Sequence, residues 1–183
     1  MLPEKNLRET RYLKKKEKFF TVTGGGTLFL FSLLLAGPIL HELMHAAWLE
    51  MLGCFYSVEA GFTLTTGVYA SIQPVCSMST VELLAFYSLG YATTIAAGGV
   101  LNLLGTRSDS RKKSLVLTAA GTGLLLSILL SVTVEGDIQS IVDLLGLPPF
   151  FADFATLFVV LGVFLSSLKP LERLFDDLER EDG

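Results

Sequence analysis

Residues 28–53 read LFLFSLLLAGPILHELMHAAWLEMLG, an apolar run that nevertheless carries two histidines and a glutamate within HELMH at 41–45. A transmembrane helix needs about 20 mostly apolar residues, so the length of the run predicts a membrane span. Ionisable side chains at membrane depth cost roughly 2.5 to 3.5 kcal/mol each on insertion scales. We therefore expect His41, Glu42 and His45 to be stabilised there by a partner or by a bound metal ion.

The composition of the whole chain agrees with a membrane protein. Its 183 residues are 51% hydrophobic and only 17% charged, and the mean hydropathy of +0.57 is high for a soluble domain. Four stretches with few or no charges are each about as long as a membrane span: 27–52, 83–104, 115–134 and 150–168. Buried helices of a soluble protein are the alternative, but no amphipathic helix is left to cover them. We predict an all-α polytopic membrane protein with four transmembrane helices.

The basic residues indicate how these spans are oriented. All 14 Lys and Arg residues lie before the first span, between the second and third, or after the fourth, whereas 53–82 and 135–149 contain none. Because basic segments stay in the cytoplasm, a multi-pass protein of the cell membrane with both termini cytoplasmic is expected. The chain then divides into a basic cytoplasmic arm (1–26), a membrane-embedded domain (27–168) and an acidic cytoplasmic tail (169–183), none of which suggests nucleic-acid binding.

The basic arm and the apolar run after it also have the outline of a signal peptide. Cleavage after Ala36 would require a small residue two positions earlier, where Leu34 stands. We therefore expect the run to remain in the protein as its first span, with the arm held against anionic headgroups of the lipid bilayer.

The spacing within HELMH suits metal chemistry. On a helix with about 100° between residues, His41 and His45 lie on one face one turn apart, and they are the two histidines of the chain. Zinc binds histidine nitrogen readily and, in catalytic sites, keeps three protein ligands and a water. Glu42 would lie where it can accept a proton from that water. The alternative is a water-lined kink after Pro38 in which the polar side chains hydrogen-bond one another.

The stretch HELMHAAWLEMLG resembles the HExxH helix of the site-2 protease family of intramembrane zinc metalloproteases, with a small residue directly after the motif and Gly53 eight positions beyond His45. The later elements follow in a similar order: a β-like segment (SVEAGFTLTTGVYASIQP, 57–74), a span with a GPxxN-type motif (AAGGVLN, 96–102) and an Asp after the next span (TVEGD, 133–137). The chain departs from the family pattern in several positions: Met44 replaces a Gly, and Gly99 replaces the Pro of GPxxN. Gly136 precedes Asp137 where the family has Asp-Gly, and no Asn-Pro segment lies upstream of it.

The resemblance implies a zinc-dependent endopeptidase in which His41, His45 and Asp137 bind the metal. It also implies that Glu42 is the catalytic base and that Asn102 polarises or holds the substrate peptide. Asn102 lies in a run of small residues that lets another helix approach closely, so an interhelical hydrogen bond is its alternative role.

The third ligand is the least determined part of the site. With no further histidine, it should be a carboxylate or Cys54, and the topology brings four acidic residues near the outer half of the spans: Glu82, Glu135, Asp137 and Asp153. The resemblance favours Asp137, which could instead cap a short helix over 138–145. Glu50 is less suitable, because its position on the helix lies about 140° from that of His45.

A small β-hairpin is predicted between the first and second spans. Residues 55–74 alternate in the manner of two strands joined at Thr65-Thr66-Gly67. An exposed strand edge could hold an unwound substrate through main-chain hydrogen bonds, although a surface hairpin without that role fits the pattern equally. Cys54 and Cys76 flank the hairpin, either as a disulfide or as two free thiols.

We therefore expect a zinc-dependent endopeptidase that cuts in or next to a transmembrane segment of a membrane protein or a membrane-anchored peptide. One alternative is a catalytically inactive protein of the same fold that acts as a binding or regulatory partner. The other is a zinc hydrolase of a lipid amide or a prenylated peptide.

Overall fold

The computed structural model describes residues 23–63, 67–134 and 136–179. Within these ranges, four helices are long and apolar enough to cross a membrane: Thr23–Met51, Thr80–Thr106, Arg111–Leu130 and Phe150–Pro170. They confirm the four predicted spans and the predicted fold class, a helical polytopic protein with a small two-stranded sheet between the first two spans. Most of the basic arm, the hairpin turn, Glu135 and the last residues of the tail lie outside the described residues.

The first span contains a wide π-helical turn, η1 (Ser32–Ala36), directly before α2 (Gly37–Met51). Pro38 has no N–H and its ring crowds the carbonyl four residues earlier, so the helix widens there and the Gly37 N–H reaches the Ser32 carbonyl instead. Turns of this kind are frequent at functional sites. HELMH begins in the next turn of α2.

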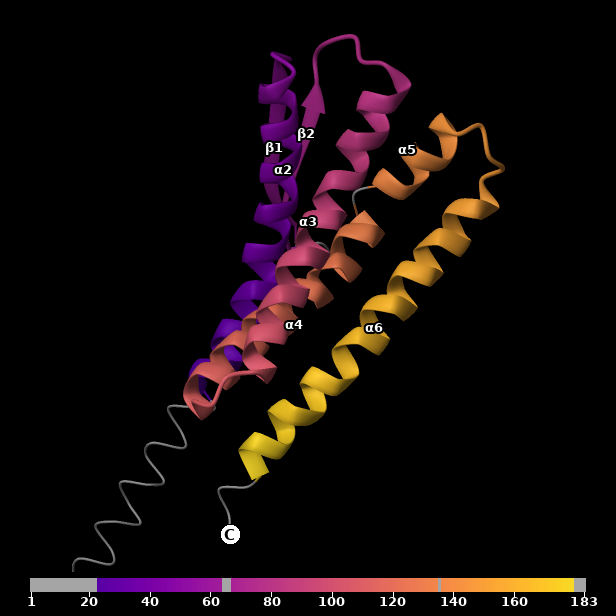
Figure 1. Cartoon of the computed structure of the whole chain (residues 1–183). Coiled ribbons are helices and arrows are strands. Elements are labelled where there is room, and N and C mark those ends of the chain that lie inside the picture. Colours follow the sequence, from indigo (N-terminus) through magenta and orange to yellow (C-terminus); the bar gives the residue numbers. More distant parts are fainter. Residues whose placement is uncertain (1–22, 64–66, 135, 180–183) are drawn as a thin grey trace, which may run out of the picture.

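Helix α4 (Arg111–Val134) is the central helix of the bundle. Within its most apolar stretch 56% is buried, against 17–22% in the other three spans. It packs against α3 (Thr80–Thr106), η1 and α6 (Phe150–Glu179), and Figure 1 shows α6 on the side of α4 away from α2. Lipid chains are as apolar as the helix surfaces, so the hydrophobic effect does not drive the helices together. Close packing of small residues contributes to their association instead.

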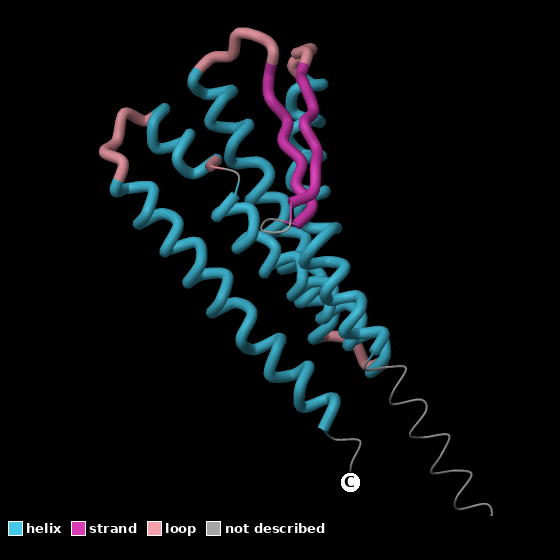
Figure 2. The backbone as a smooth tube through the Cα atoms, turned by 180° about the vertical axis from the view of Figure 1, so that it is seen from behind, coloured by secondary structure: helices cyan, strands magenta, loops and turns pink. Residues whose placement is uncertain are grey.

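The hairpin confirms the predicted pair of strands. Strand β1 (Tyr56–Thr63) runs antiparallel to β2 (Gly67–Pro74), with Tyr56 opposite Pro74 and Thr63 opposite Gly67. Figures 1 and 2 both show it running alongside α2. Its flanking cysteines form the disulfide Cys54–Cys76, which decides between the two states that the sequence left open.

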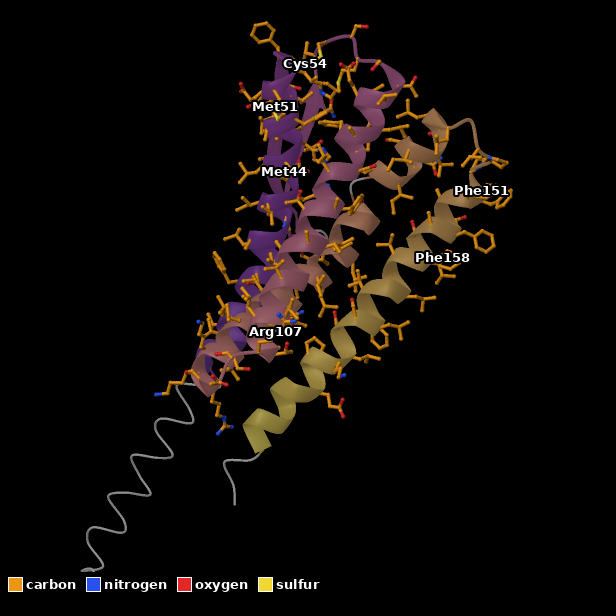
Figure 3. All side chains as sticks on the ribbon, in the orientation of Figure 1. Met44, Met51, Cys54, Arg107, Phe151 and Phe158 are labelled. Atoms are coloured by element: carbon orange, nitrogen blue, oxygen red, sulfur yellow. A yellow bond between two sulfur atoms is a disulfide. The ribbon has the colours of Figure 1, made fainter. Side chains whose placement is uncertain are left out.

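The bundle has two chemically different ends. The end that carries Cys54–Cys76 is called the disulfide end, and the opposite end, where Arg107 follows α3, is called the basic end (Figure 3). Between them the surface is apolar: Phe158, for example, is 73% exposed, and Figure 3 shows it pointing away from α6. Such a surface is the kind that lipid chains cover.

Candidate metal centre

Two helices bring the histidine pair and an aspartate together inside the bundle. His41 and His45 lie on α2, and Asp137 is the first residue of α5 (Asp137–Leu144), the short helix after α4. Asp137 Oδ2 lies 3.0 Å from Nε2 of His41 and 3.3 Å from Nε2 of His45. Asp137 is 8% exposed, His41 1% and His45 3%. The structure therefore gathers the three predicted ligands at one buried point.

The spacing of these atoms suits a tetrahedral ion. Ligand atoms about 2.0–2.1 Å from a tetrahedral zinc lie roughly 3.3–3.4 Å from one another. Both distances to Asp137 Oδ2 are close to this separation, and a ligand atom from each of His41, Glu42 and His45 lies within 4.8 Å of the other two. These distances are also those of hydrogen bonds, and an ionised carboxylate oxygen can accept from both histidines.

Glu42 lies beside the histidines with one oxygen unsatisfied. The residue is 7% exposed, and its Oε2 is buried and has no hydrogen-bond partner in the part of the chain that the structure describes. The carboxylate also accepts a hydrogen bond from the backbone N–H of Ile72 in β2. A buried oxygen without a donor is costly, and a water held at the histidines would supply one.

The electrostatic state of Asp137 suits cation binding. Burial alone would raise the pKa of its carboxyl group, but the hydrogen bonds and charges of His41 and His45 outweigh burial and hold that pKa below its ordinary value. The carboxylate is therefore ionised at neutral pH, which is the form that a metal ion binds.

The capping role considered for Asp137 is not the one observed. Helix α5 begins at Asp137 itself, one residue earlier than the predicted 138–145, and its N-cap is Gly136 at φ 69°. No side chain caps this end by a hydrogen bond. The Asp137 carboxylate faces the histidines of α2 instead, from the first turn of a helix that packs against α3 and α6.

The other candidate ligands are engaged elsewhere. The Glu82 carboxylate accepts hydrogen bonds in the capping box at the start of α3, Glu50 accepts one from the Tyr56 hydroxyl, and Cys54 is in the disulfide. Asp153 is exposed in the first turn of α6. Among the candidates that the structure describes, Asp137 is the one in contact with the histidines.

No protein family, no curated protein and no solved structure matches this chain. The resemblance to site-2 proteases stays a prediction. It rests on HELMH, the hairpin that follows it, AAGGVLN and Asp137; the structure brings HELMH, the hairpin and Asp137 together, whereas Asn102 of AAGGVLN lies elsewhere.

Helix α3 forms the wall behind the histidines. A Cβ atom at Gly90 would lie 2.5 Å from the ring of His41, so only glycine leaves room for the imidazole. The Tyr91 ring packs edge-on to His41 at a centroid distance of 4.8 Å, and Phe86 packs against His45 at 4.3 Å. Sequence reasoning missed these residues, because nothing in an apolar span shows which positions will face α2.

Asn102 is not brought to this centre. It lies twelve positions beyond Gly90, about 18 Å further along α3 at 1.5 Å per residue. Its Oδ1 accepts a hydrogen bond from the Thr122 hydroxyl of α4 at 3.2 Å, where a Cβ at Gly121 would come within 2.8 Å of the same oxygen. The side chain therefore makes the interhelical hydrogen bond that the sequence held as its alternative role.

Proposed function

We propose that this protein is a zinc-dependent endopeptidase that hydrolyses a peptide bond in or next to a transmembrane segment of a membrane protein or membrane-anchored peptide. One observation carries the proposal: an aspartate oxygen lies 3.0 and 3.3 Å from the Nε2 atoms of two histidines, near the separation of tetrahedral zinc ligands, and Glu42 lies beside them. His41, His45 and Asp137 would hold the ion and leave its fourth position open.

Glu42 is the general base in this proposal. Bound zinc supplies Lewis acidity, which activates a water and polarises the substrate carbonyl. Glu42 accepts a proton from the attacking water and passes it to the leaving amine. Its buried Oε2, which has no hydrogen-bond partner among the described residues, supports this role.

Strand β2 supports the binding of an extended substrate. The Ile72 N–H points to Glu42 and hence away from β1, and alternate residues of an antiparallel strand turn their main-chain groups to the same edge. Ala70 and Pro74 therefore share that edge, where Pro74 needs no partner because it has no N–H. A transmembrane helix must unwind before it is cut, and an unwound peptide can pair with the main-chain groups of this edge that Glu42 does not engage.

We further infer that the disulfide end faces the outside of the cell membrane and that both termini of the chain are cytoplasmic. The arrangement of basic residues supports this orientation. The disulfide Cys54–Cys76 supports it independently, because disulfides form in oxidising compartments outside the cytoplasm.

A cleavage assay tests the proposed activity. Full-length protein in proteoliposomes is incubated with a set of single-span substrates, with and without a chelator. We expect cleavage that chelation removes and zinc restores, and a loss of about 10²- to 10⁴-fold in Glu42→Gln with zinc still bound.

The matched control is Glu50→Gln. It changes a carboxylate on the same helix, but this carboxylate contacts the Tyr56 hydroxyl and not the histidines. It should cleave at the wild-type rate. Cleavage by Glu42→Gln at the rate of this control, or cleavage that chelation leaves unchanged, would rule out the proposed activity.

The position of Asn102 favours one second candidate. Its side chain is held against α4 and away from the histidines, so the group that the resemblance assigns to the substrate is missing from the centre. A binding or regulatory partner that keeps the metal without catalysis would fit this arrangement. Such a protein would retain substrates in the same assay without cutting them.

A further inference from the structure

A second site lies at the basic end of the bundle. A pocket of about 380 Å³ lies there between the end of α3 and the part of α6 around 166–170. Its lining consists of Asn102, Leu103 and Thr106 from α3 and Ser166, Lys169 and Pro170 from α6. The two membrane-spanning stretches end at Thr106 and Pro170, so the pocket lies where hydrocarbon meets lipid headgroups. It takes no part in the proposed proteolysis.

The pocket contains a buried donor that lacks an acceptor. Asn102 is 6% exposed, and although its Oδ1 accepts from Thr122, its Nδ2 has no hydrogen-bond partner among the described residues. A buried amide in this state is costly unless something accepts from it. Lys169, which is exposed at the pocket, adds a positive charge. An anionic acceptor would satisfy both groups.

The remaining lining suits a ligand that is polar at one end and apolar at the other. The Ser166 hydroxyl donates to the backbone carbonyl of Val163, so its oxygen is able to accept from a hydroxyl of a ligand. Exposed leucines continue from the pocket along the lipid-facing surface: Leu103, Leu104, Leu165 and Leu168. A phospholipid has both parts, whereas a free anion uses only the polar one.

The charge around the pocket favours an anionic headgroup. Arg107 follows α3, and the first turn of α4 adds Arg111, Lys112 and Lys113 at the same end, against Asp109 in the loop and Glu172 on α6. Figure 3 shows Arg107 at this end of the bundle. Basic pockets between transmembrane helices on the cytoplasmic side are typical binding sites for anionic lipids.

We propose that this pocket binds the phosphate headgroup of an anionic phospholipid. Lys169 and the Asn102 amide contact the phosphate, the Ser166 oxygen accepts from a headgroup hydroxyl, and the acyl chains lie along the exposed leucines. Asn102 lies away from the metal centre, and in this proposal its amide binds the lipid phosphate instead.

Lipid binding to full-length protein in neutral detergent tests this site, with phosphatidylglycerol, phosphatidylcholine and inorganic phosphate as separate probes. Native mass spectrometry gives the occupancy at each concentration. We expect phosphatidylglycerol to bind more tightly than phosphatidylcholine, and Lys169→Gln to weaken it about fivefold, the usual effect of one basic residue at an anionic lipid. Lys113→Gln is the matched control, since this exposed lysine lies at the same end but outside the pocket, and it should weaken binding less than Lys169→Gln does.

Ser166→Phe fills the pocket without changing charge and should abolish the preference for phosphatidylglycerol, with thermal unfolding as the check on folding. Wild-type affinity in both Lys169→Gln and Ser166→Phe, or equal affinity for the two lipids, would overturn the proposal. Binding of inorganic phosphate as tight as that of phosphatidylglycerol would overturn the lipid assignment. Glu42→Gln should bind lipid as wild type does, so failure here and failure of the proposed protease are separate results.

Discussion

Gly90 shows that a single residue outside the ligand set can determine the orientation of a ligand side chain in the candidate centre. The ring of His41 occupies the volume that any larger side chain at this position of α3 would need. The imidazole therefore keeps its orientation toward Asp137 only while α3 carries no side chain there, and orientation of a ligand ring commonly changes metal affinity 10- to 100-fold.

Gly90→Ala should accordingly weaken zinc binding by at least about tenfold, measured by competition with a chelator of known affinity. Gly99→Ala is the matched control, because it makes the same change on the same helix where a Cβ meets nothing within 4 Å. Equal zinc affinity in the two variants would show that the approach of α3 to His41 has no part in the centre.

The residue scale also shows how far the sequence predicts the centre. His41, Glu42 and His45 could be predicted because helix periodicity alone fixes their common face. Asp137 is 92 positions beyond His45, so only the resemblance selected it from the acidic residues at that depth. The Gly90 contact and the Ile72 amide at Glu42 could not be predicted, since both depend on where another element crosses α2.

Among the elements, the hairpin is the one whose position depends on a covalent link. The disulfide Cys54–Cys76 joins the end of α2 to the end of β2, and β2 in turn contacts Glu42. Hydrophobicity and alternation predicted the four spans and the two strands well. The π-turn at Ser32–Ala36 and the contact between β2 and α2 arise from a proline and from tertiary packing, which periodicity does not record.

Replacing both cysteines by serine should loosen the hairpin. A disulfide that closes a loop of this length contributes about 3 kcal/mol to stability, so amide exchange over 56–74 should become faster while exchange within α4 stays unchanged. Hydrogen exchange with mass spectrometry measures both regions at once. Reduced wild-type protein should behave as the double variant does, and unchanged exchange in the hairpin would show that the link does not hold it.

For the whole molecule, the exposed apolar side chains along all four spans fit a multi-pass membrane protein, and the proposed orientation places the disulfide end outside. The sequence predicts this organisation because length, hydropathy and basic residues each act on whole segments. It does not predict that α4 is the central helix, which follows from packing of glycines such as Gly98 and Gly121.

Labelling from outside intact cells tests the orientation. In a background with both native cysteines replaced by alanine, Ser77→Cys at the disulfide end should react with a membrane-impermeant maleimide, and Asp109→Cys in the basic loop should react only after lysis. The reverse pattern would place the disulfide end in the cytoplasm.

The central claim is that one metal ion joins α2 to α5. The metal content of purified full-length protein, supplied with zinc and then freed of unbound ions, tests it most directly. We expect about one zinc per chain in the wild type and in Asp153→Ala, which removes an exposed carboxylate from the first turn of α6, and a loss of zinc in Asp137→Ala. A wild-type protein without zinc, or Asp137→Ala with as much zinc as Asp153→Ala, would contradict the claim.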